Sequence, residues 1–163
     1  MSKNPVSFFV SYAHANKSAK ETFMSLFSEQ TAAAKNFDYQ FWSDKDLRIG
    51  SDWRQSIAAA LDETDFGLLL ISPAFLGSKF IVERELPTYL NHAGKHCFPV
   101  MLAPIDFDRH DLKGLQDKQI YRLDSADFKV PRAFSELKPK RKTDFVQGVF
   151  AQIDDWLFAN LKK

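Results

Sequence analysis

Apolar residues fall along the chain in short blocks that alternate with longer amphipathic stretches. Residues 6–12 (VSFFVSY) and 66–71 (FGLLLI) are apolar runs without helical period, and their β-branched and aromatic content predicts buried strands. The second run has no polar alternation, which is typical of a central strand covered on both faces. Residues 37–42 and 96–102 give two further strands, and residues 119–123 give a short fifth strand.

Segments with helical periodicity separate these strands. A helical region over residues 74–91 is interrupted by Gly77 and Pro87. In three other segments apolar residues recur at i, i+3 and i+4, the spacing of one helix face, after a residue that can cap a helix. Helices are predicted from the capping Asn16 to about residue 35, from the capping Ser51 to about residue 63, and from the capping Thr143 to about residue 161.

Five strands alternating with helices imply a parallel sheet with right-handed crossovers. We predict an α/β protein with a flavodoxin-like three-layer fold, a five-stranded parallel sheet in the order 2-1-3-4-5 and helices on both faces. A chain of 163 residues without a repeat or linker fits one domain, residues 1–163. Ligands bind such sheets at the carboxyl ends of the strands, at the switch point between strands 1 and 3. That crevice would be lined by residues 11–16, the loop after Trp42, and the chain from Ser72 onward.

Composition excludes several partners. The 22 Lys and Arg residues nearly balance the 21 Asp and Glu residues, so a net charge of +1 offers no surface for nucleic acid or an anionic membrane. The one cysteine, Cys97, cannot form an internal disulfide, and the four histidines have no second thiol for a structural zinc site. The opening MSKNP is short and polar, and no apolar run approaches the roughly 20 residues that span a bilayer. We therefore expect a soluble, cytoplasmic protein without a metal site.

The residues at the predicted crevice exclude the common chemistries of this fold. A response-regulator receiver needs acidic residues after strand 1 and an aspartate after strand 3, where this chain has Ser11-Tyr12 and Ile71-Ser72. The segment after strand 1, YAHAN, is not the loop in which flavodoxins hold a flavin phosphate. No P-loop, GxGxxG or GxSxG motif occurs. The function must therefore come from another pattern of residues.

Three separated segments, in order, resemble the TIR (Toll and interleukin receptor homology) domain family in its bacterial form. Residues 6–12 resemble its first motif, a strand that ends in Ser-Tyr. Residues 41–50 (FWSDKDLRIG) are similar to its "BB" loop, although Arg48-Ile49-Gly50 stands where many members have a proline before the glycine. Residues 72–81 and the following Glu-Leu-Pro resemble the stretch after strand 3, and Asp155-Trp156 corresponds to the third motif. The resemblance covers almost the whole chain.

The enzymatic branch of this family cleaves the bond between nicotinamide and ribose in NAD+, so the resemblance implies NAD+ as substrate and no cofactor. It places the catalytic glutamate at Glu85, and a short shift in alignment would exchange Glu85 for Glu83. On a helical wheel Glu85 lies at the edge of the apolar stripe and Glu83 on the opposite flank, so one faces the crevice and the other solvent. That stripe runs through Phe75, Val82, Leu86 and Tyr89.

Other residues near the crevice are candidates for substrate binding. Tyr12, Trp42 and Trp53 could stack on nicotinamide or adenine, or could simply pack; Phe9, in the middle of a strand, is expected in the core. His14 could contact a phosphate or be exposed. Asp44 could bind ribose hydroxyls or hold the loop.

Two functions from different classes follow from the resemblance. The first is an NAD+ glycohydrolase in bacterial immune defence that yields nicotinamide and ADP-ribose or cyclic ADP-ribose and is activated by self-assembly. The second is a non-enzymatic adaptor that acts through homotypic contacts of the BB loop. The expected partners are NAD+, other TIR protomers in a homo-oligomer or filament, and, if the chain is the TIR portion of a larger protein, a fused or separate sensor module.

Overall fold

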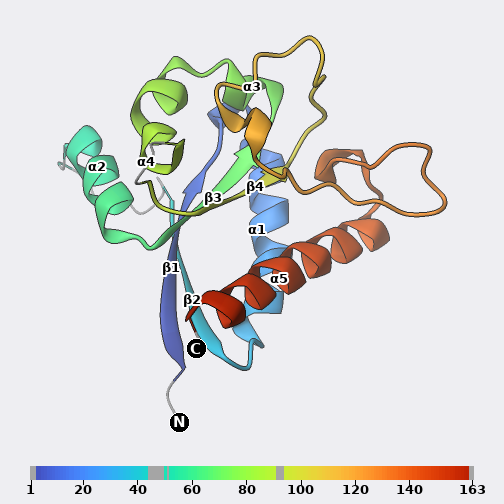
Figure 1. The fold of residues 1–163 in the computed structure, drawn as a ribbon, viewed down its shortest axis with the longest axis horizontal. Helices are drawn as coiled ribbons and strands as arrows, with labels where there is room; N and C mark the ends of the chain where they lie inside the picture. The colour runs from blue at the N-terminus through green and yellow to red at the C-terminus, as the bar shows by residue number, and fades with distance from the viewer. Residues whose placement is uncertain (1–2, 44–49, 51, 91–93, 162–163) are drawn as a thin grey trace.

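The computed structural model describes residues 3–43, 50, 52–90 and 94–161. Within them, four strands form one parallel sheet in the order β2-β1-β3-β4 (Figure 1). The strands are β1 (Asn4–Ser11), β2 (Phe37–Trp42), β3 (Phe66–Ile71) and β4 (Cys97–Met101). β3 lies between β1 and β4, and all of its residues are buried. The prediction of a central strand is therefore confirmed.

Helices cover both faces of the sheet, which confirms the predicted α/β fold class (Figure 1). One face carries α1 (Lys17–Ala32) and α5 (Pro139–Leu161), whose phenylalanines Phe23, Phe27 and Phe145 pack in one core with Phe8 of β1. The second core, on the other face, joins α2 (Trp53–Glu63), α3 (Pro73–Leu76), the π-helical turn η3 (Ile81–Glu85) and α4 (Pro87–Leu90). No helix among the described residues is both long and apolar enough to cross a membrane. The assignment of residues 1–163 to a single domain stays a prediction.

The fifth strand that the sequence predicts over residues 119–123 is reduced to one isolated bridge. Tyr121 exchanges two backbone hydrogen bonds with β4, donating to the Pro99 carbonyl and accepting from the Met101 amide, each at 2.9 Å. In a strand the backbone groups of alternate residues point to the same edge, so the nitrogen at position 99, like the amide of Met101, faces the edge along which residues 119–121 run. Proline has no N–H to donate there, and the ladder does not extend. Leu123 pairs instead with Arg132 in an antiparallel bridge.

Helix ends also differ from the sequence prediction. Asn16 precedes α1 but makes no capping bond with its side chain; its Oδ1 accepts from Ser72 Oγ at 2.6 Å and joins the ends of β1 and β3. Asp52 caps α2 by accepting from the amides two and three residues later, while Ser51 lies outside the described residues. α5 begins at Pro139, before the predicted Thr143, because a first-turn proline needs no backbone donor.

His96, just before β4, gives the fold a dependence on pH. Its ring stacks on Trp156 of α5 at 4.1 Å between centroids, and burial, aided by the nearby charge of Lys118, lowers its pKa from 6.5. Below about pH 6.5 the unfolded chain therefore binds the proton more readily than the folded protein, and this group lowers the free energy of unfolding as pH falls. We expect His96→Phe, which keeps a ring against Trp156, to weaken that loss. Urea unfolding at pH 7.5 and pH 5.5 measures the difference, and equal losses in the two proteins would contradict it.

Candidate functional site

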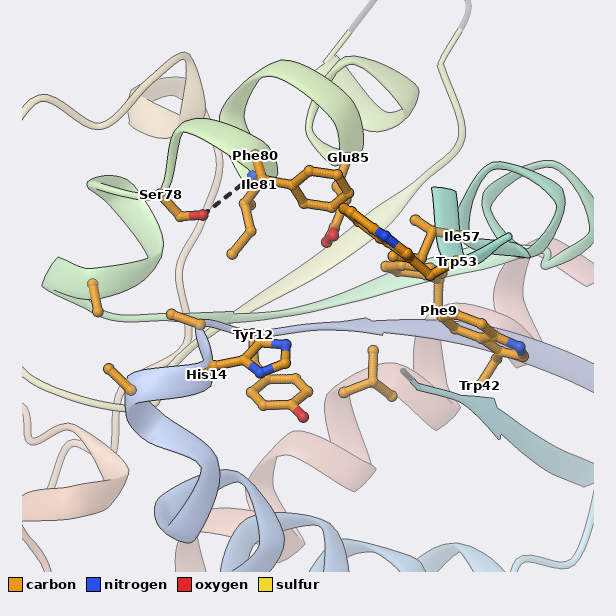
Figure 2. A pocket seen from close by; sticks show the side chains of 14 residues that line it. Phe9, Tyr12, His14, Trp42, Trp53, Ile57, Ser78, Phe80, Ile81 and Glu85 are labelled. Carbon is orange, nitrogen blue, oxygen red and sulfur yellow. Dashed lines mark hydrogen bonds between the residues drawn. The ribbon is translucent and has the colours of Figure 1, made fainter. Parts of the chain in front are cut away.

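A cavity of about 580 Å³ opens beside the carboxyl end of β1, between the 3-10 turn η1 (His14–Asn16), the end of β2, α2 and the chain from α3 to η3. Five residues that the sequence singles out line it: Tyr12, His14, Trp42, Trp53 and Glu85 (Figure 2). These residues are far apart in the sequence. They come together because β1 lies between β2 and β3 in the sheet, so the segments that follow these three strands meet at one edge. The sixth, Asp44, lies outside the described residues. Their roles in binding stay predictions.

Two pairs of aromatic rings form walls of the cavity. Trp42, at the end of β2, stacks on Phe9 of β1 with ring centroids 5.0 Å apart and an interplanar angle of 18°. Across the cavity, Trp53 of α2 lies against Phe80 at 5.3 Å, and 44% of the Trp53 surface is exposed (Figure 2). Phe9 is 2% exposed, so it belongs to the core as expected and lines the cavity as well. The cavity thus offers flat apolar surface on opposite sides.

A third aromatic pair lies at the end of β1. The Tyr12 ring stacks on the exposed His14 ring at 5.7 Å, and the Nζ atom of Lys20 lies 4.7 Å from the Tyr12 centroid. Lys20 is only 4% exposed, and the sequence analysis missed it. The sequence does indicate that Lys20 is buried, because it lies three and seven residues before Phe23 and Phe27, on the same face of α1. A buried cation therefore lies next to the tyrosine that lines the cavity.

Glu85 is the buried carboxylate of the site. It ends η3, is 7% exposed and points into the cavity (Figure 2). Glu83 is exposed and does not line the cavity. Ser11 Oγ, at the end of β1, donates to Glu85 Oε1 at 2.5 Å. Of the two glutamates between which the sequence left a choice, Glu85 is the one at the cavity. The sequence analysis did not single out Ser11 as its partner.

A π-helical turn carries Glu85 to the cavity. The amide of Leu86 donates to the carbonyl of Ile81, five residues earlier, at 3.0 Å, and Pro87 follows at once without a donor of its own. The wider turn shifts the helix faces, so Ile81 is buried where the wheel predicted Val82, which is half-buried. It also places Phe80 and Glu85 on one side, and both line the cavity. π turns occur often at functional sites.

The buried phenol of Tyr89 interacts electrostatically with the Glu85 carboxylate. Burial raises the pKa of the Tyr89 phenol well above the usual value, and the negative charge of Glu85 raises it further. Its ring covers Gly67 of β3, where an added Cβ would approach the ring to 2.6 Å. Among the described residues, no three His, Cys, Asp or Glu side chains are grouped to hold a metal ion. Among the described residues that line the cavity, Glu85 is the one carboxylate, and it lies between the aromatic walls.

The cavity lies at the carboxyl ends of the parallel strands, where α/β sheets of this kind bind their ligands. The sequence profile of the TIR domain family matches residues 8–138, and the chain belongs to that family. The match runs from the middle of β1 to the last residue before α5 and so includes every residue of the cavity. None of the curated proteins matches the chain. Domains of this family generally self-associate, and the family includes NAD+ hydrolases.

Proposed function

We propose that the protein is an NAD+ glycohydrolase that cleaves the bond between nicotinamide and ribose, releasing nicotinamide and ADP-ribose or cyclic ADP-ribose. The observation that carries the proposal is the position of Glu85, 7% exposed, on the wall of an aromatic cavity of about 580 Å³. Membership of the TIR family supports the same activity. The proposed setting is bacterial immune defence.

One carboxylate is sufficient for this reaction. Nicotinamide leaves from a pyridinium as a neutral molecule, so no acid is needed to protonate the leaving group, unlike in common glycosidases. The ribose becomes an oxocarbenium ion, and Glu85 would lie beside that positive charge. At about 4 Å a carboxylate contributes roughly 1 kcal/mol in water but about 4 kcal/mol at an effective dielectric constant near 20. The exclusion of water is therefore as important as the charge itself.

The aromatic walls supply that exclusion and a place for the planar rings. The stacked pair of Phe9 and Trp42 and the pair of Trp53 and Phe80 stand on either side of the cavity. We assign them to the nicotinamide and adenine rings of NAD+, and we assign the exposed His14 to its phosphates. Asp44, in the BB loop, is proposed to bind ribose hydroxyls.

Self-assembly is proposed to complete the site. Trp53 is 44% exposed although it belongs to a wall of the cavity, so this side is open to water in the single chain. A neighbouring protomer that covers Trp53 would lower the local dielectric constant and strengthen the action of Glu85. Sensor modules that gather the protomers would then switch on the activity.

Nicotinamide release from NAD+ tests the proposal directly. Purified protein is incubated with NAD+ over a wide range of protein concentrations while light scattering follows assembly. We expect the rate per molecule to rise at least tenfold across the concentration at which oligomers form. A rate per molecule that stays constant across that concentration would contradict activation by assembly. Absence of release from fully assembled protein would overturn the hydrolase proposal and favour the adaptor.

A further inference from the structure

Ser11 is the residue that joins the carboxylate of the site to the sheet. It is the last residue of β1 and is 1% exposed. It does not line the cavity, yet its Oγ donates to Glu85 Oε1 at 2.5 Å across 74 positions of sequence. We propose that Ser11 is a positioning residue that fixes the Glu85 carboxylate beside the positive charge that develops on the ribose. This inference rests on the proposed function and adds a residue to its machinery.

The two ends of this hydrogen bond differ in rigidity. Ser11 belongs to β1, which pairs with both β2 and β3, and it lies opposite Leu69 in the register with β3. Glu85 is the last residue of a π turn, two residues before Pro87, which begins α4 and has no backbone N–H to donate. Its side chain also has three rotatable torsions. The sheet therefore provides a fixed point, and the Ser11 hydroxyl restricts the torsions of the Glu85 side chain.

A bond of this kind acts on rate more than on affinity. Hydrogen bonds to charged groups are short and about twice as strong as neutral ones, so one donor can select a single rotamer of the carboxylate. A catalytic group must be held within roughly 0.5 Å of its productive position. Because Ser11 does not line the cavity, its loss removes no contact with NAD+. The expected signature is a lower kcat at nearly constant KM.

The same strand supplies a matched control. Ser7 also donates its hydroxyl to a carboxylate, Asp65 Oδ2, at 3.0 Å, but this pair is exposed and none of its atoms lines the cavity. Ser7→Ala therefore removes an equivalent hydroxyl from β1 without touching Glu85. Ser11→Cys fills the buried space with only a weak donor, and Ser11→Thr keeps the hydroxyl.

The kinetic experiment compares these variants in nicotinamide release. We expect Ser11→Ala and Ser11→Cys to lower kcat between tenfold and a hundredfold with KM changed less than threefold, Ser11→Thr to recover most of kcat, and Ser7→Ala to match the native protein. A kcat of Ser11→Ala within twofold of native would overturn the inference. So would a parallel loss in Ser7→Ala, because that result would report only the stability of β1.

A measurement that needs no turnover separates this inference from the proposed function. Unfolding in urea is compared for the native protein, Ser11→Ala, Glu85→Ala and the double variant. If the hydroxyl holds the carboxylate, the single effects overlap, and the double variant is about tenfold more stable in its unfolding equilibrium constant than their sum predicts. Additive effects would overturn the inference. If the two substitutions are strongly coupled but the assembled protein releases no nicotinamide, the contact between Ser11 and Glu85 is supported and the hydrolase proposal is overturned.

Discussion

Glu85→Gln is expected to lower the rate of nicotinamide release by about a thousandfold. The substitution preserves the size of the side chain and an oxygen for the Ser11 hydroxyl, and removes only the negative charge. A carboxylate stabilises a cation about 4 Å away by roughly 4 kcal/mol at an effective dielectric constant near 20, and the variant loses this stabilisation. Because each 1.36 kcal/mol corresponds to a tenfold change in rate, the loss amounts to about a thousandfold. The measurement is kcat for nicotinamide release from assembled protein.

Glu83→Gln is the matched control for that variant. Glu83 lies two residues earlier on the same π turn and carries the same charge, but it is exposed and does not line the cavity. Its loss of charge is screened by water, so kcat should stay within about twofold of native. A collapse of activity in Glu83→Gln with native activity in Glu85→Gln would show that the wrong glutamate has been assigned. Equal losses in both variants would point to the charge of the turn as a whole.

The central strand of the sheet could be predicted from sequence because burial on both faces leaves a continuous apolar run. That strand is β3, and all of its residues are buried. The fifth strand failed for a reason that composition does not reveal. Only the direction of the hydrogen bonds at Met101 and Tyr121 shows that Pro99 faces the same edge and cannot extend the ladder. Local patterns therefore predicted which segments are buried and missed how the last one pairs.

The site was predictable to the extent that it follows from motifs in order along the chain. Tyr12 directly follows β1 and Trp42 ends the adjacent β2, and parallel strands bring their carboxyl ends to one edge. Periodicity could not choose the correct helix face at Glu85, because the wheel assumed α-helical geometry and the chain makes a π turn there. The contact of Ser11 with Glu85 spans 74 positions and leaves no mark in either local sequence. Such pairings become visible only in three dimensions.

Gly67→Ala is expected to lower the free energy of unfolding by about 3 kcal/mol, the upper range for overpacking a core. Its Cβ would lie 2.6 Å from Cε1 and Cζ of Tyr89, and the Tyr89 ring is 2% exposed and cannot swing aside into solvent. Glycine in a strand often marks such a close approach of another group to the backbone. Here the ring of α4 rests directly on β3. Urea unfolding of the two proteins measures the difference.

Gly77→Ala controls for the general effect of replacing glycine. Its added Cβ would meet nothing closer than 3.4 Å, the Pro73 carbonyl oxygen, and the backbone there is ordinary for alanine. The free energy of unfolding should therefore stay within about 0.5 kcal/mol of native. Combining Gly67→Ala with Tyr89→Leu should recover part of the loss, because the shorter side chain leaves room over β3. A Gly67→Ala protein as stable as native would contradict the prediction, because it would mean that the Tyr89 ring and α4 shift without cost.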